Sequence, residues 1–171
     1  EPIFKDIILE KILLKEGDGG YLLNTKILNY HAALNGEFSP ELIDLMGEAR
    51  NHNEEFSDHH RNIAASVQAA YEEILLYMLS WAKSKEPTYE NLCIAGGCGL
   101  NVTANGKIVK NKIFSKVLIP PAPHDAGASI GACFLAESLS GSPRSALSMP
   151  TPYLGKSYKE SEIEKIFNDM N

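Results

Sequence analysis

The sequence predicts an α/β domain that is helix-rich and contains short parallel strands. Residues 59–84 carry the strongest helical pattern, because apolar side chains recur there at steps of three and four and would form one wide apolar face. Residues 92–95 and 117–119 are short apolar runs bounded by Gly and Pro, which is typical of buried strands. A helical stretch, residues 98–110, lies between the two runs, and strand–helix–strand order favours parallel pairing.

The remaining elements follow from turn and capping signals. Residues 4–15 predict an imperfectly amphipathic helix that ends at the turn Gly17-Asp18-Gly19-Gly20. A second helix, residues 40–49, has Ser39 as its cap and Pro40 at its first position. The other expected elements are one or two short strands within residues 21–30, a polar loop over 51–59, a cap at Ser57 or Asp58, a helix over 125–139, a Ser- and Pro-rich linker over 140–152 and a short helix over 161–169.

Composition argues against several function classes. The chain has 171 residues, the size of one ordinary domain, with 16 Lys and Arg, 22 Asp and Glu and a formal net charge of −6. This mild acidity argues against a broad nucleic-acid-binding face, which needs clustered Lys and Arg. No apolar run approaches the roughly 18 residues of a membrane helix. The first residues also lack the basic region followed by an apolar stretch that is typical of a signal peptide. We therefore expect a cytoplasmic protein with neither a nucleic-acid nor a membrane partner.

The cysteines and the first residues add to this expectation. Cys93, Cys98 and Cys133 are odd in number and lack the spacing of a zinc site, so we interpret them as small buried residues of a reduced protein. The chain begins at Glu1, without an initiator Met and in the middle of a helical pattern. We expect it to be an excised piece of a longer chain.

The first candidate site is the segment Ala-Gly-Gly-Cys-Gly-Leu-Asn at residues 95–101. Gly96 and Gly97 follow a predicted strand and lead into a helix, so the backbone can pass close to a ligand and present N–H groups to it. Asn101 could add a side-chain hydrogen bond. These residue types suit a nucleotide phosphate or ribose, but a tight strand-to-helix turn without a ligand would use the same pattern.

The second candidate is the segment Pro-Ala-Pro-His-Asp-Ala-Gly-Ala at residues 121–128. Asp125 opens a predicted helix, so its carboxylate could cap that helix or could be a hard oxygen ligand for a divalent metal. His124 could be a ligand or a proton carrier, but an exposed loop residue is the simpler interpretation. Gly127 begins a helix face of small residues that permits close approach.

A third group of polar residues, between Arg50 and Arg61, includes the adjacent His59 and His60. Neither HExxH nor HxxxH spacing occurs, so a zinc site is not indicated. We interpret this segment as solvated surface.

Two segments together resemble one known enzyme family. The stretch LCIAGGCGLNVTANGKI, followed by VLIPPAPHDAGASIGACFLAE, resembles the C-terminal half of the catalytic domain in NodU/CmcH carbamoyltransferases. LMGEARNHNEEFSDHHRNIAASVQAAYEEIL is similar to the preceding helix of that family, and PYLGKSYKESEIEKIF is similar to its junction with a second domain. The resemblance implies one lobe of an actin-like ATPase (ASKHA, ribonuclease H-like) fold over residues 1–150. Residues 151–171 would be a linker and the start of the following carbamoyl-adenylate-forming domain.

The resemblance also implies roles for individual residues. Gly96, Gly97 and Asn101 match the nucleotide-contacting turn of the family, and Gly127 matches a glycine beside the phosphates. Asp125 matches its metal-ligating aspartate and would be the catalytic residue here. The implied cofactors are ATP, as carbamoyl-adenylate, and a divalent metal, iron or another transition metal. The HxxxH pair that completes the metal site in the family is missing from this sequence, so we expect this chain by itself to have little or no activity.

The implied function is transfer of a carbamoyl group from carbamoyl phosphate, via carbamoyl-adenylate, to a hydroxyl of a small molecule or sugar, as in nodulation or secondary-metabolite synthesis. The expected partners are carbamoyl phosphate, ATP and a hydroxylated small-molecule acceptor, and an uncovered apolar face could support a homodimer. Two alternatives stay open: an actin-like kinase or ATPase lobe, and a non-catalytic nucleotide-binding module.

Overall fold

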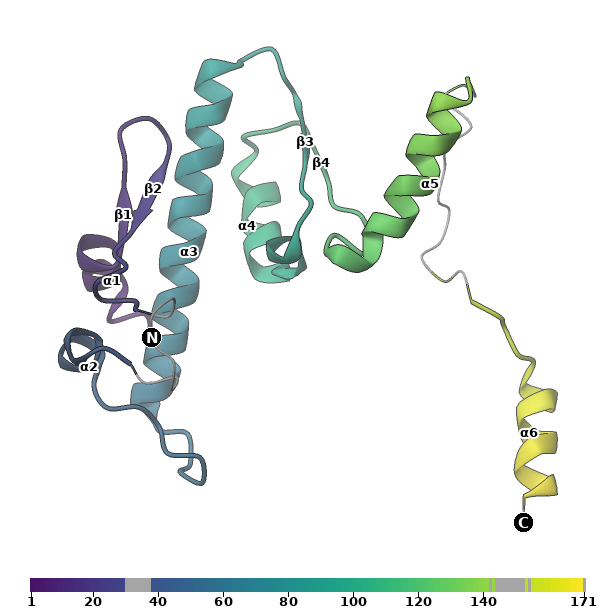
Figure 1. Ribbon diagram of the computed structural model, residues 1–171, viewed down its shortest axis with the longest axis horizontal. Helices are drawn as coiled ribbons and strands as arrows, with labels where there is room; N and C mark the ends of the chain where they lie inside the picture. The colour runs from purple at the N-terminus through teal and green to yellow at the C-terminus, as the bar shows by residue number, and fades with distance from the viewer. Residues whose placement is uncertain (30–37, 142, 144–152, 154, 171) are drawn as a thin grey trace. The chain divides into compact units, whose positions relative to one another are not determined.

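A computed structural model describes residues 1–29, 38–141, 143, 153 and 155–170 of the chain (Figure 1). The chain divides into two units that are described separately below. Unit 1 comprises Glu1–Cys93 and Asn101–Leu118, and unit 2 comprises Ile94–Leu100 and Ile119–Asn171.

Both units combine helices with short strands or turns, so the chain is α/β and helix-rich, as predicted. The elements of unit 1 are α1 (Lys5–Lys11), β1 (Leu13–Lys15), β2 (Tyr21–Leu23), α2 (Pro40–Met46), α3 (Asp58–Lys85), β3 (Asn91–Cys93), α4 (Val102–Asn111) and β4 (Lys116–Leu118). The elements of unit 2 are the 3₁₀ turns η1 (Gly97–Leu100) and η2 (Asp125–Gly127) and the helices α5 (Ala128–Leu139) and α6 (Glu160–Asp169).

Helix α3 is the central element of unit 1 and confirms the predicted long helix. Ser57 is its N-cap residue, and the Ser57 backbone N–H donates to His60 Nδ1 at 3.1 Å. The core where α3 meets α1 and α2 contains Ile8, Ile12, Met46 and Ala70, all less than 8% exposed. Burial of this apolar face, rather than helix propensity, is what stabilises so long a helix.

The first predicted helix is too long, because residues 13–15 form a strand instead. Strand β1 pairs antiparallel with β2 in the register Leu13↔Leu23 and Lys15↔Tyr21. The Gly-rich turn at residues 17–20 joins the two strands, and Gly19 has a φ of +82° that favours glycine. A hairpin pairs backbone groups that a frayed helix end would leave to water.

The predicted parallel pair is confirmed by β3 and β4, with Leu92 opposite Val117. The predicted burial of these strands is wrong, because only the central residue of each is half-buried and the others are exposed. The predicted helix over residues 98–110 begins later than expected. Residues 97–100 form η1, and α4 starts at Val102 with Asn101 as its N-cap. The helix predicted over residues 125–139 likewise opens as the 3₁₀ turn η2 before α5.

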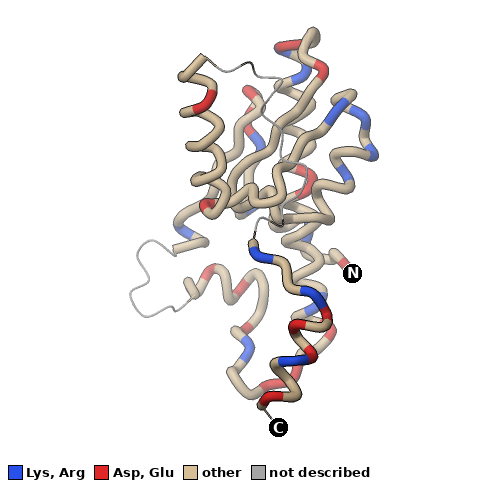
Figure 2. The backbone as a smooth tube through the Cα atoms, turned by 90° about the vertical axis from the view of Figure 1, so that its right-hand side faces the viewer, with Lys and Arg blue, Asp and Glu red and all other residues tan. Residues whose placement is uncertain are grey.

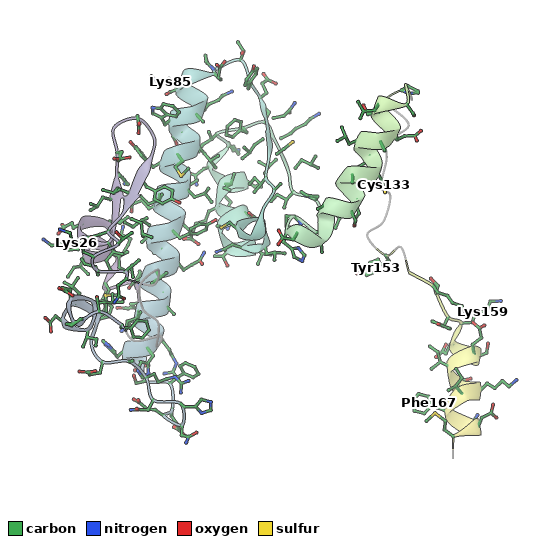
Figure 3. The ribbon with its side chains drawn as sticks, in the orientation of Figure 1. Lys26, Lys85, Cys133, Tyr153, Lys159 and Phe167 are labelled. Atoms are coloured by element: carbon green, nitrogen blue, oxygen red, sulfur yellow. The ribbon has the colours of Figure 1, made fainter. Side chains whose placement is uncertain are left out.

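The prediction that the cysteines are buried is wrong. Cys93, Cys98 and Cys133 are all free and exposed. Strand β3 is only half-buried at its centre, and α5, on which Cys133 lies (Figure 3), has no buried residue. The apolar neighbours that suggested burial in the sequence, Leu92, Ile94 and Phe134, are themselves only half-buried.

Basic and acidic residues are interspersed along the described chain (Figure 2). None of the described helices is long and apolar enough to span a bilayer. The linker predicted over residues 140–152 lies largely outside the described residues.

The cap of α2 yields a first testable expectation. Ser39 is 3% exposed; its Oγ accepts from the Leu42 N–H at 3.0 Å and donates to the Ile27 carbonyl at 2.6 Å. Ser39→Ala should lower the free energy of unfolding by about 1–2 kcal/mol, because both partners lose a bond. Urea unfolding followed by Trp81 fluorescence measures this. Ser84→Ala removes an exposed hydroxyl from α3 and should change stability by less than about 0.5 kcal/mol.

Candidate nucleotide-binding site

Unit 2 brings the two glycine-containing segments of the sequence together. The backbone N–H of Gly96 donates to the Pro123 carbonyl at 2.6 Å, and Gly96 has a φ of +102°. Gly99 is buried, and a Cβ placed on it would lie 2.8 Å from Pro123 Cβ. The chain therefore needs glycine at residue 96 for its conformation and at residue 99 for close approach.

The second segment packs on itself around Gly127. The Gly127 N–H donates to the His124 carbonyl at 2.9 Å. A Cβ on Gly127 would lie well inside van der Waals contact with the Ala122 carbonyl oxygen. Gly127 thus lets the loop after β4 fold closely over the start of α5.

These contacts enclose one side of a cavity of about 420 Å³ within unit 2. Its walls are mainly apolar or small side chains, with one carboxylate and one imidazole and without Lys or Arg. The lining residues are Ala95, Gly96, Pro120, Ala122, Pro123, His124, Asp125, Gly127, Ala128, Ile130, Gly131 and Phe134. A cavity of this size and character suits part of a small ligand.

Asp125 brings the only carboxylate of this cavity lining. The capping role considered for it is not what the structure shows, since His124 is the N-cap residue of η2 and no side chain caps the turn. Asp125 is exposed, and among the described residues no donor bonds its carboxylate. The group is therefore available to a ligand or cation.

The metal site implied by the family resemblance is not complete in the described residues. No group of three or more His, Cys, Asp or Glu side chains in that part of the chain could hold a metal ion. Asp125 is suited to be one oxygen ligand, but a bound divalent ion needs several. Further ligands would have to come from residues outside those described.

Asn101 belongs to unit 1, where its side chain is already engaged. Asn101 Oδ1 accepts from the Ala104 N–H at 3.0 Å, which caps α4. Gln68 on α3 forms two hydrogen bonds with the Asn101 carboxamide, of 3.1 and 2.9 Å. Gly97 is exposed, and no atom lies within 4 Å of where its Cβ would be.

The structure thus places three of the predicted site residues, Gly96, Asp125 and Gly127, at one cavity. Gly97 is not among its lining residues, and the ligand-binding roles of all five residues remain predictions. Gly99 and Pro123 lie within the two predicted segments, although neither was assigned a role of its own. Sequence reasoning missed Ile130 and Phe134, because these apolar residues looked like ordinary helix residues.

The His- and Arg-rich segment makes local structural contacts, in line with its interpretation as surface. Arg50 donates to the Asn51 carbonyl at 3.0 Å and stacks over the Phe56 ring at 4.5 Å. The His59 ring hydrogen-bonds the Met46 carbonyl through Nε2 at 2.7 Å and meets Phe4 edge-on. Each of these side chains orders the chain between α2 and α3.

Comparison with known proteins matches residues 3–134 to the family model described as "Carbamoyltransferase N-terminus". The chain is 34% identical over 172 residues to the uncharacterized protein sll1178 of Synechocystis, covering 96% of this chain and 27% of that protein. It is 36% identical over 100 residues to nodulation protein NolO of Bradyrhizobium diazoefficiens, covering 58% of this chain and 18% of that protein. Nodulation protein U of Rhizobium tropici is 40% identical over 73 residues, 42% of this chain and 13% of that protein.

The chain spans about a quarter or less of the length of these relatives. The family match, however, covers most of the chain, from α1 into α5, and includes both glycine-containing segments. The chain therefore belongs to the carbamoyltransferase N-terminal domain family.

Proposed function

We propose that the full gene product transfers a carbamoyl group from carbamoyl phosphate, via carbamoyl-adenylate, to a hydroxyl of a small molecule or sugar, and that this chain supplies one lobe of an actin-like catalytic domain. Family membership supports the carbamoyl chemistry. The observation that supports a nucleotide-binding role for this lobe is the unit 2 cavity, where Gly96, Asp125 and Gly127 lie together.

The lining of the cavity favours an adenylate over a free triphosphate. A triphosphate carries several negative charges, and proteins usually offset them with Lys, Arg or a metal. This lining contains neither Lys nor Arg. Apolar side chains such as Ile130 and Phe134 suit the base and sugar of a nucleotide, which carry no charge.

Asp125 is the residue with the most direct chemical role in this proposal. Its carboxylate would be one ligand of a divalent metal, iron or another transition metal, which when bound would polarise the carbamoyl carbonyl. The Gly96 turn would hold the adenylate in register, which is a positioning role. Gly97 and Asn101 would be further nucleotide contacts, as the resemblance to the family implies.

The test uses the full gene product with carbamoyl phosphate, ATP and a divalent metal. We expect carbamoyl-adenylate to be detected by mass spectrometry, and radiolabelled carbamoyl to reach one of a panel of sugars and oligosaccharides. Asp125→Asn should leave adenylate formation unchanged and lower transfer at least tenfold. Asp44→Asn, an exposed carboxylate on α2, should change neither.

The other two functions predict different products. Phosphate transfer from ATP without use of carbamoyl phosphate would establish the kinase or ATPase lobe instead. Intact ATP after long incubation, bound but not cleaved, would establish a binding module. Either result contradicts the carbamoyltransferase proposal.

A further inference from the structure

A polar network joins α3 to α4 inside unit 1; it is buried at Glu72 and half-buried at Gln68 and Asn101. Glu72 is only 4% exposed, and its carboxylate accepts from Gln68 Nε2 at 2.8 Å and from Lys107 Nζ. Gln68 Nε2 also donates to Asn101 Oδ1 at 3.1 Å, and Asn101 Nδ2 donates back to Gln68 Oε1 at 2.9 Å. Asn101 Oδ1 accepts from the Ala104 N–H as well. The chain of bonds therefore runs from a buried carboxylate to a helix N-terminus.

The two ends of this network force both carboxamides into one orientation. The Ala104 backbone N–H can only donate, so it must face Asn101 Oδ1 rather than the amide nitrogen. An ionised Glu72 can only accept, so it must face the amide nitrogen of Gln68. Burial raises the pKa of Glu72, but the hydrogen bonds from Gln68 and Lys107 and the charge of Lys107 outweigh it, so the net pKa lies below its ordinary value. Glu72 is thus ionised at neutral pH.

The fixed orientation determines which hydrogen bonds the Asn101 side chain can still form. Its Oδ1 already accepts two hydrogen bonds, which is the capacity of a carbonyl oxygen. Its Nδ2 uses one hydrogen on Gln68, and among the described residues none accepts the second. Asn101 can therefore serve a ligand only as a hydrogen-bond donor.

We propose that Gln68 and Glu72 are positioning residues that hold Asn101 as a hydrogen-bond donor toward an oxygen acceptor, a hydroxyl or phosphate oxygen, of a bound adenine nucleotide. This proposal rests on the proposed function, in which Asn101 contacts that nucleotide. Packing α3 against α4 does not require such a network, because apolar side chains of similar volume join helices without burying a carboxylate. A chain of hydrogen bonds that begins at a buried carboxylate and ends on Asn101 is therefore better explained by the orientation that it imposes.

A double-mutant cycle on nucleotide affinity tests whether Gln68 acts through Asn101. The probes are AMP and Mg-ATP, titrated calorimetrically into the full gene product. We expect Asn101→Ala to weaken binding of the preferred nucleotide about tenfold, and Gln68→Met to weaken it about fivefold. In the double variant, affinity should be no lower than in Asn101→Ala alone, because the orienting group has nothing left to orient.

Two further variants separate positioning from general stability. Ser66 is fully buried on α3 and bonds Phe4 N and the Asn62 carbonyl, so Ser66→Ala should lower the melting temperature and leave nucleotide affinity unchanged. Asn101→Asp keeps an oxygen for the Ala104 N–H but removes the free donor, so it should bind nucleotide at least as weakly as Asn101→Ala.

The outcomes distinguish this inference from the function on which it rests. If the unmodified protein binds neither AMP nor Mg-ATP, the proposed function fails. If it binds, and the losses from Gln68→Met and Asn101→Ala multiply in the double variant, Gln68 acts independently of Asn101 and the positioning role is wrong. Unchanged affinity in Asn101→Asp would likewise overturn the donor assignment.

Discussion

Replacing Gly127 with alanine is expected to distort unit 2 at the candidate site. The new Cβ would overlap the Ala122 carbonyl oxygen, and backbone atoms cannot move aside as a flexible side chain can. The loop that carries Pro123 would have to shift, and with it the acceptor of the Gly96 N–H. We expect a loss of about 3 kcal/mol of local stability, measured as faster hydrogen exchange of the Gly96 amide.

A second glycine on the same wall of the cavity is the matched control. Gly131 lies within α5, and no atom lies within 4 Å of where its Cβ would be. Gly131→Ala should leave the exchange of the Gly96 amide unchanged and could stabilise α5 by up to about 1 kcal/mol. Equal exchange rates in the Gly127 and Gly131 variants would contradict the close approach at Gly127.

Removing Lys107 is expected to have the largest effect on unit 1, because it leaves the Glu72 carboxylate with one partner. The Glu72 side chain is 4% exposed, whereas Lys107 is half exposed, so water can replace part of the lost interaction. Lys107→Met should therefore lower the free energy of unfolding by about 2–3 kcal/mol at pH 7, somewhat less than for a fully buried pair. Urea unfolding measures this, with Lys110→Met on the same helix as a control expected to change it by less than about 0.5 kcal/mol.

The pH dependence of the stability difference between Lys107→Met and the unmodified protein tests whether the charge of Lys107 on Glu72 causes that difference. In the unmodified protein, the pKa of Glu72 lies below its ordinary value of 4.5, so its contribution to stability is present above about pH 4.5 and is lost as the pH falls through the folded pKa. Without Lys107, burial is opposed only by Gln68, so the pKa of Glu72 rises. The stability difference between the two proteins should then shrink as the pH falls from 7 to 3. A difference that stays constant would show that Lys107 acts through packing.

Much of the local structure could be predicted from the sequence. The periodic apolar stripe predicted α3, Ser39 with Pro40 predicted the start of α2, and the short apolar runs predicted β3 and β4 and their parallel pairing. These signals are local, since capping, helical periodicity and strand length depend on residues near one another in the chain. The same two glycine-containing segments carried the family resemblance, which the family match supports.

Other features depended on contacts between distant residues. Residues 13–15 have a helical pattern, yet they pair with β2 because a turn brings that strand beside them. The cysteines have apolar neighbours, yet they are exposed, because burial is decided by what packs against an element and not by its own composition.

The sequence by itself determined most of the elements, the family and the candidate residues Gly96, Asp125 and Gly127. Only the tertiary structure decided that these three residues share one cavity, and that Asn101 is bonded to Gln68, which in turn bonds the buried Glu72 on α3. Gln68 and Asn101 are 33 residues apart in the chain. The physical reason is that hydrogen-bond satisfaction and steric approach are properties of neighbours in space, which no local pattern of residues encodes.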